Sequence, residues 1–387
     1  MERIKVSDFL LELRCEEIPA RMQAGARADL EKLFREQMAK WGATLGEITV
    51  WSTPRRLALI AHDLPATTAP TREEVKGPRT NAPEQALEGF LRKTKLSREQ
   101  LVDRDGVWFA IQELPGFAMS EVLQNAIFAI VLDFPWPKSM RWGEYSRHTT
   151  SLRWVRPLSG IVALLDGEVV GQRLSANLDG VEPGRTTVGH RFHHSEEITL
   201  ESADDYVSKL RAAYVLVDHT ERQDLIRTGA AKAAAQAGLV LVEDEGLVIE
   251  NAGLTEWPVP LLGRFAEAFL EVPPEVIQLT ARTNQKYFVC NDSAGKLANA
   301  FICTANIAAT DGGAAIIDGN RKVLAARLSD ARFFWEQDRK KTLAQHAEGL
   351  ARITFHEKLG TLADKAERVA KLARWLVEEG PSPARPC

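Results

Sequence analysis

Residues 8–13, DFLLEL, form an apolar run of strand length, and the sequence on its C-terminal side decides which fold class is expected. Residues 20–41 place apolar side chains at three- and four-residue steps, which predicts a helix with one buried face. Residues 48–64, ITVWSTPRRLALIAHDL, return as extended chain after Gly42 and Gly46. The chain is therefore predicted to open as strand, helix, strand. The apolar positions of the predicted helix are Leu30, Leu33, Phe34, Met38 and Trp41.

Hairpins and helices follow one another in the rest of the chain. Asp166-Gly167 lies between apolar runs in GIVALLDGEVVGQRL (160–174), which is typical of a hairpin with a two-residue turn. A second hairpin is expected at 286–306, and a third at the turn DRDG (103–106). Because strands and helices mix without a regular βαβ repeat, the sequence favours an α+β fold with mixed sheets, packed helices and a helical C-terminal segment. Helices are predicted at 84–93, 120–132 (capped by Ser120), 203–238 and most of 342–379, and a surface connection at 67–83.

This pattern predicts several domains in a chain of 387 residues. We expect an N-terminal α+β unit at 1–66, a connecting α+β segment at 67–150 and a central α+β domain at 151–341. The helical segment at 342–387 is expected to begin a further, truncated domain, and its last residues, GPSPARPC, to be a disordered tail.

Composition and charge limit the possible functions. The net charge of −4 excludes a uniformly basic nucleic-acid binder, so any polyanion must meet a local patch. No apolar run approaches the roughly 18 residues that a membrane-spanning helix needs. The four cysteines show no CxxC spacing, and the N-terminus lacks the pattern of a signal peptide, so we expect a cytoplasmic protein.

The usual catalytic motifs are absent from the sequence. SAGKLAN (293–299) and DGGAAIIDGN (311–320) are not phosphate-binding loops, and Ser159 does not lie in a GxSxG elbow. Cys290 and Cys303 are interpreted as small core residues. His190, His193 and His194 in GHRFHH could contribute to a metal site, but no Cys or carboxylate nearby completes a ligand shell. We therefore predict no catalytic and no metal-ligating residue.

Basic residues interleaved with aromatics are the stronger signal. FPWPKSMRWGEYSRHTTSLRWVRPLSG (134–160) contains two Arg-Trp pairs, five Lys or Arg and one acid. Residues 321–341 contain seven bases against three acids, whereas 243–275 contain eight acids and one base. Such segregation lets a net-acidic protein bind phosphates locally, although the aromatics could equally be core residues with the arginines paired around them. The candidate RNA contacts are Arg55, Arg56, Lys138, Arg141, Arg153, Arg156, Arg191 and Lys286.

A series of motifs in one order resembles a known family, the beta subunit of the bacterial two-subunit glycine–tRNA ligase (glycyl-tRNA synthetase). The resemblance runs from about residue 8 to about residue 378 and corresponds to the N-terminal half of that family. The motifs are LLELRCEEIPA, TPRRLAL, KGPR, PKSMRWG, RWVRPLSGIVALL, GHRF, LTEWPVPLLGRF, NQKYF, GNRKVLAARLSDARFFWEQDRKK and FHEKLGTLADKAER.

The resemblance implies a subunit that binds tRNA(Gly) and an alpha subunit, in an alpha2beta2 assembly. ATP and Mg would be used by the alpha subunit, which is similar to class II synthetases, and this chain would bind no cofactor and hold no complete active site. Two alternatives stay open at this point. The chain could be an assembly module for the alpha subunit with little tRNA contact, or a stand-alone metal-dependent hydrolase that uses the His190 cluster.

Overall fold

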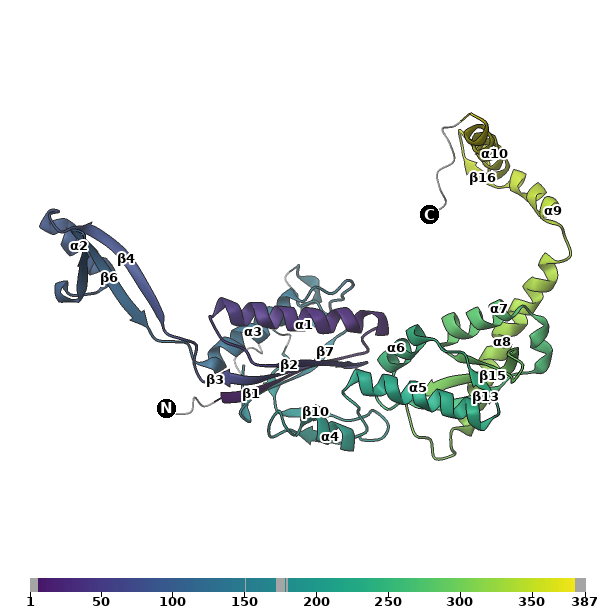
Figure 1. The fold of residues 1–387 in the computed structure, drawn as a ribbon, viewed down its shortest axis with the longest axis horizontal. Coiled ribbons are helices and arrows are strands. Elements are labelled where there is room, and N and C mark those ends of the chain that lie inside the picture. Colours follow the sequence, from purple (N-terminus) through teal and green to yellow (C-terminus); the bar gives the residue numbers. More distant parts are fainter. Residues whose placement is uncertain (1–5, 150, 172–177, 179, 380–387) are drawn as a thin grey trace.

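The structure, a computed structural model, describes residues 6–149, 151–171, 178 and 180–379. Figure 1 shows an elongated molecule with two central units, an arm that projects from the first unit, and a C-terminal segment that α8 connects to the second unit. None of the described helices has the length and apolarity needed to cross a membrane. The ends of two predicted features, residues 172–174 of the first hairpin and the tail from residue 380, lie outside the described residues.

The first unit is built on one sheet with β1 at its centre. β1 pairs antiparallel with β3 on one side and with β7 on the other, so the predicted opening strand is the middle strand of this sheet. A short strand, β9 (Pro183–Gly184), pairs parallel to β7. The remaining order is β2 (Ile48–Thr53), β3 (Arg56–Pro65), β1 (Val6–Cys15), β7 (Leu158–Leu165) and β8 (Glu168–Val169).

Alternation along β1 divides the core of this unit between two faces. Phe9, Leu11 and Leu13 pack under α1 (Ala20–Lys40) and α3 (Met119–Asp133). Leu10 points to the opposite face, which is covered by α4 (Tyr206–Ala212) and the hairpin of β10 (Thr186–Val188) and β11 (Glu197–Thr199). Glu12 follows the same alternation, so a carboxylate is buried on this second face.

The arm is a three-stranded antiparallel sheet with its own small core. The strand order is β4 (Thr71–Arg79), β6 (Val107–Leu114) and β5 (Leu101–Arg104), and α2 (Glu84–Thr94) packs on it through Leu87 and Phe90. The predicted connection at 67–83 is therefore wrong over most of its length. The polar composition of this segment predicted a connection, but residues 71–79 form a strand that is stabilised by pairing with β6.

The second unit contains a four-stranded antiparallel sheet between two layers of helices. Its order is β12 (Val240–Leu241), β14 (Phe288–Asn291), β15 (Leu297–Ala305) and β13 (Val259–Arg264). α5 (His219–Gln236) and α6 (Glu245–Leu254) cover one face. α7 (Pro274–Leu279), the π-helix Thr280–Gln285 and α8 (Ala314–Asp338) cover the other.

The C-terminal segment contains α9 (Leu343–Ala347), a small hairpin of β16 (Thr354–His356) and β17 (Gly360–Thr361), and α10 (Leu362–Glu378). The prediction of helix almost throughout 342–379 misses this hairpin. Among the described residues, no side chain of α10 is buried, and Val369, Leu372 and Trp375 are about half exposed.

The α+β prediction is confirmed, and the main hairpins are present. Asp166 and Gly167 both adopt positive φ angles, 53° and 80°, as the predicted two-residue turn requires. The helix predicted from Ser120 begins at Met119, with Ala118 as its N-cap and no side-chain cap. Because β7 pairs with β1, the sheet of the first unit crosses the expected boundary at residue 151.

Candidate functional site

Two basic segments of the first unit lie side by side because an isolated β-bridge joins them. The backbone N–H of Met140 donates to the carbonyl of Trp154 at 2.8 Å, and the N–H of Trp154 donates to the carbonyl of Met140 at 3.2 Å. This bridge places the segment that contains Lys138 and Arg141 beside the segment that contains Arg153 and Arg156. The structure thus groups four of the eight predicted contacts.

Aromatic side chains support the bridge from below. Trp154 is fully buried, and its ring lies 4.9 Å from that of Phe134 and 5.1 Å from that of Trp136, between ring centroids. Phe134 and Trp136 stack on each other at 4.6 Å. Trp136 and Trp154 are therefore core residues, which was one of the two interpretations that the sequence left open, whereas Trp142 is only partly buried against this core.

The cations border a surface hollow of about 620 Å³. Lys138 and Arg153 line it together with Ser139 and the carboxylate of Asp133, and Trp136 forms part of its wall. Among the described residues, neither Lys138 nor Arg153 forms an ion pair, and both are exposed. We call this set of residues the basic hollow. It presents two cations and one carboxylate to solvent, and an anionic group could bind to the two cations.

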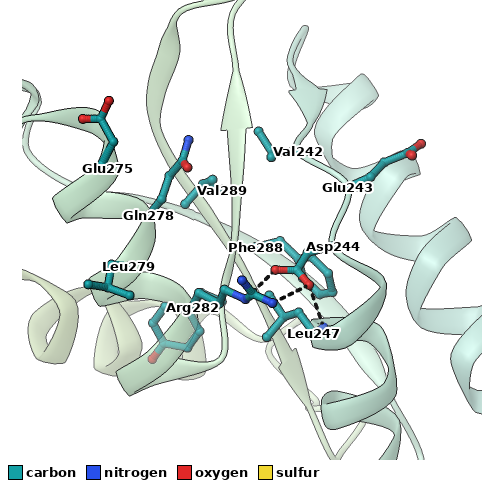
Figure 2. A pocket seen from close by; sticks show the side chains of 11 residues that line it. Val242, Glu243, Asp244, Leu247, Glu275, Gln278, Leu279, Arg282, Phe288 and Val289 are labelled. Atoms are coloured by element: carbon teal, nitrogen blue, oxygen red, sulfur yellow. Dashed lines mark hydrogen bonds and ion pairs between the residues drawn. The ribbon is translucent and has the colours of Figure 1, made fainter. Parts of the chain in front are cut away.

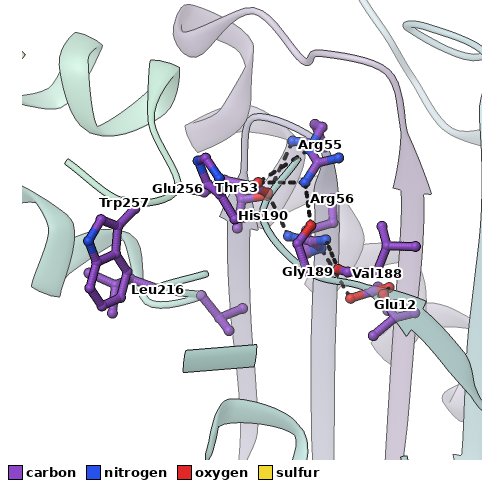
Figure 3. Close-up of polar contacts among 12 residues, drawn as sticks. Glu12, Thr53, Arg55, Arg56, Val188, Gly189, His190, Leu216, Glu256 and Trp257 are labelled. Carbon is purple, nitrogen blue, oxygen red and sulfur yellow. Dashed lines mark hydrogen bonds and ion pairs between the residues drawn. The ribbon is translucent and has the colours of Figure 1, made fainter. Parts of the chain in front are cut away.

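Arg55 and Arg56 have a different environment, at the junction between the two units (Figure 3). Arg56 is fully buried, and its Nη1 lies 2.5 Å from Oε1 of Glu256. Arg55 donates from Nη2 to Oε2 of Glu256 at 2.7 Å and to the carbonyl of Gly189 at 2.8 Å. Glu256 comes from the second unit, so this cluster holds the two units together. Arg56 has no exposed surface with which to reach a phosphate.

Arg56 is flanked by a second buried carboxylate from β1. Its Nε lies 3.2 Å from Oε2 of Glu12, which also accepts a hydrogen bond from the hydroxyl of Tyr206 at 2.6 Å. Thr187 donates to the other oxygen of Glu12. Burial by itself would raise the pKa of Glu256, but Arg56 and Arg55 outweigh it and lower that pKa below its ordinary value. The junction therefore keeps its charges paired in a dry environment.

Arg222 forms a second link across the junction. Its guanidinium donates to the carbonyl of Ser52 at 2.7 Å in the first unit and to that of Ala252 at 2.9 Å in the second. It also donates to the carbonyls of Leu216 and Val217. Burial lowers the pKa of Arg222 to about 10, so the side chain stays protonated at neutral pH.

The last two predicted contacts are both paired, and Arg191 is exposed whereas Lys286 is partly buried. Arg191 lies 3.1 Å from Glu16, between Nη2 and Oε2, and Lys286 lies 2.9 Å from Glu250, between Nζ and Oε1. Exposed pairs of this kind contribute little, so either cation could exchange its partner for a phosphate. Neither residue lines the basic hollow.

The histidine cluster is occupied by backbone hydrogen bonds. Nδ1 of His190 accepts from the N–H groups of Phe192 and His193 at 3.2 and 3.3 Å, and Nε2 of His193 accepts from the N–H of Ala308 at 3.0 Å. Among the described residues, no three His, Cys, Asp or Glu side chains converge as a metal site would require. The hydrolase alternative therefore gains no support from this cluster.

The buried thiols are poorly suited to nucleophilic chemistry. Burial raises the pKa of Cys15 to about 12 and the pKa values of Cys290 and Cys303 to about 11. At neutral pH these groups stay protonated, and the thiolate is the reactive form. This agrees with the interpretation of Cys290 and Cys303 as core residues.

A pocket in the second unit was not expected from the sequence (Figure 2). It has a volume of about 370 Å³ and lies between the start of α6 and the π-helix. Arg282 and Asp244 pair at its edge, 2.7 Å apart between Nε and Oδ2, and Asp244 also accepts from the N–H of Leu247 at 2.9 Å as the cap of α6. Arg282 and Asp244 are therefore engaged in structural contacts, while the carboxylates of Glu243 and Glu275 also line the pocket.

Glu256 is the most important residue that sequence reasoning missed. It was only one of eight acids in the segment 243–275. Its neighbours in the sequence do not distinguish it, because its partners Arg55 and Arg56 lie about two hundred residues away. An acid within LTEWPVP, between a helix and a strand, was the only available local signal.

Comparison with known proteins gives one consistent result. The family model for the glycyl-tRNA synthetase beta subunit matches residues 9–384. The glycine–tRNA ligase beta subunits of Paracoccus denitrificans and Phenylobacterium zucineum are 48% and 50% identical over 95% and 94% of the chain. The corresponding protein of Rhodospirillum centenum is 45% identical over 95% of the chain. The chain spans about half of these relatives, since the matched regions cover 54% of each. The chain belongs to the glycyl-tRNA synthetase beta-subunit family.

Proposed function

We propose that this chain acts as part of a two-subunit glycine–tRNA ligase, in which it binds tRNA(Gly) and the alpha subunit. The alpha subunit would attach glycine with ATP and Mg, and this chain would hold no complete active site and bind no cofactor. The single observation that carries the proposal is the family match over residues 9–384. An alpha2beta2 assembly is the stoichiometry we expect.

The basic hollow is the RNA contact that we propose within this function. Lys138 and Arg153 line the hollow, and the exposed Arg141 and Arg156 lie on the same two bridged segments. Buried aromatic side chains pack beneath this bridge. Phosphate contacts release counterions, so the logarithm of the binding constant falls linearly with the logarithm of the salt concentration. Each phosphate contact steepens this salt slope by about 0.7 to 0.9. The hollow should therefore bind RNA in a salt-sensitive manner.

The test combines charging with binding. Glycine charging of tRNA(Gly) is measured for the alpha subunit with and without this chain, and stimulation supports the proposal. The affinity of the chain for tRNA(Gly) is then measured against salt for the double variant Lys138→Gln, Arg153→Gln. We expect the slope to fall by about 1.4 to 1.8. The matched control is Lys32→Gln, Arg35→Gln on α1, where both cations already pair with Glu36 and Glu31.

The assembly-module function is the second candidate, and a specific observation favours it. Arg55 and Arg56 bind Glu256 inside the protein, so two of the eight expected RNA contacts serve the fold. If the chain co-migrates with the alpha subunit on a sizing column and yet neither binds tRNA nor stimulates charging, this second function is correct.

A further inference from the structure

The second half of α8 is unusual because it is a helix with almost no core contacts. The buried residues of α8 are Leu324 and Leu328, and both precede Ser329. From Ser329 to Asp338 no described side chain is buried, and Figure 1 shows this part of α8 leading away from the second unit. Nevertheless it contains the run Phe333-Phe334-Trp335.

The two phenylalanines present open rings to solvent. Phe333 is 55% exposed and Phe334 is 63% exposed, and their rings meet edge to face with 5.4 Å between centroids. Exposed aromatic surface of this kind has a hydration cost and marks an interaction site when it gathers at one place. Arg332 fixes the helix beside them by pairing with Glu271 at 2.6 Å.

Cations without an ion pair among the described residues occur in the same segment as these rings. The segment from Arg327 to Lys341 has five bases and three acids, in a chain whose net charge is −4. Within the described part of the chain, Arg327, Arg339, Lys340 and Lys341 form no ion pair, and the guanidinium of Arg339 lies 5.5 Å from the ring centre of Trp335. Cations at a helix C-terminus complement its dipole, which explains the last three but not the exposed phenylalanine pair beside them.

Positive charge that complements phosphate, next to flat rings on which bases can stack, is the chemistry by which proteins bind unpaired RNA. We propose that the exposed strip Arg327, Phe333, Phe334, Arg339, Lys340 and Lys341, here called the α8 strip, binds RNA, with Phe333 and Phe334 stacking on unpaired bases and the cations on phosphates. This inference rests on the proposed function and adds a contact surface, on the second unit, to the basic hollow on the first. The sequence singled out the charge of 321–341, but none of the eight predicted contacts lies in it.

The test measures binding of tRNA(Gly) to the whole chain for paired variants. Phe333→Leu, Phe334→Leu keeps an apolar surface and removes the rings, and we expect about a tenfold or larger loss of affinity. Phe333→Tyr, Phe334→Tyr keeps the rings and should bind like the unaltered chain. Lys340→Gln, Lys341→Gln should reduce the salt slope by about 1.5. The charge control is Arg92→Gln, Lys93→Gln, which removes two exposed cations from α2 of the arm.

Each outcome of these measurements supports or overturns RNA binding by the α8 strip. Loss of affinity in the leucine variant, with the tyrosine variant intact, supports the α8 strip as an RNA-stacking surface. Unchanged affinity in the leucine and glutamine variants overturns this inference and leaves the proposed function standing. Variants that weaken co-migration with the alpha subunit while tRNA affinity is unchanged show a protein interface and also overturn it. If the unaltered chain does not bind tRNA(Gly) at all, the proposed RNA contact and this inference fail together.

Discussion

Arg56 and Glu256 lie 200 residues apart in the sequence and meet across the junction of the two units, with 2.5 Å between Nη1 and Oε1. Arg56 also faces Glu12 on β1, and Arg55 binds the same Glu256 carboxylate from the other side. The two units are therefore joined by buried ionic contacts in addition to apolar packing. Four predictions follow from this junction and from the cores on either side of it.

Glu256→Gln should destabilise the protein strongly. The substitution keeps the shape of the side chain but removes one of the two carboxylates that face the buried Arg56. Breaking a buried ion pair in this way lowers the free energy of unfolding by about 3–5 kcal/mol. Urea unfolding measures the change in the free energy of unfolding. Glu250→Gln, which breaks a partly exposed pair with Lys286, is the control and should cost less than about 1 kcal/mol. Equal effects of the two substitutions would contradict the importance of the buried pair.

Gly253→Ala should loosen the packing of α6 against α1. A Cβ at this position would lie 2.6 Å from Cβ and 2.9 Å from Cα of Ala20, and the backbone atom cannot move aside easily. We expect a loss of about 1–3 kcal/mol in a thermal or urea unfolding experiment. Gly25→Ala is the control within α1, since no atom lies within 4 Å of its added Cβ, and it should stabilise by about 0.5–1 kcal/mol. A stable Gly253→Ala protein would show that α1 and α6 can separate without cost.

His219 should make stability depend on pH in the mildly acidic range. Burial, with Arg27 and Arg222 nearby, lowers the pKa of His219 from 6.5 to about 4. As the pH falls, His219 therefore becomes protonated near pH 6.5 in the unfolded chain but only near pH 4 in the folded protein. Stability is full above pH 6.5 and declines as the pH falls toward 4, by up to about 1.4 kcal/mol per pH unit.

Unfolding experiments at several pH values between 7 and 4.5, on the unaltered chain and on His219→Gln, measure this contribution. The variant should show a flatter decline than the unaltered chain. An NMR titration of the imidazole gives the pKa directly, and a value near 6.5 would rule out the proposed environment.

Trp154→Ala should destabilise the protein much more than the removal of an exposed tryptophan does. Trp154 is fully buried beneath the basic hollow, and removal of such a ring costs about 3–5 kcal/mol. The control is Trp375→Ala on α10, where the ring is 51% exposed and the change should stay near 0.5 kcal/mol. Differential scanning calorimetry of both variants provides the comparison. A small loss for Trp154→Ala would mean that the β-bridge between Met140 and Trp154 does not need its aromatic support.

Local pattern by itself determined much of this protein. The period of apolar residues identified β1 and α1, and Asp166-Gly167 identified a hairpin, because hydrophobic spacing and turn chemistry act over a few residues. The mixture of elements was sufficient for the α+β class, and the ordered motifs were sufficient for the family.

Only the tertiary structure decided which of the predicted cations pair with a carboxylate and which lie on the surface without such a partner among the described residues. Arg55 and Arg56 have the same local signature as Lys138 and Arg153, but the first two meet Glu256 across the junction while the second two lie on an open surface. β4 likewise became a strand only because β6 lies beside it. The physical reason is that charge pairing, burial and strand pairing depend on partners brought together by folding, and a sequence shows a residue's chemistry without its neighbours in space.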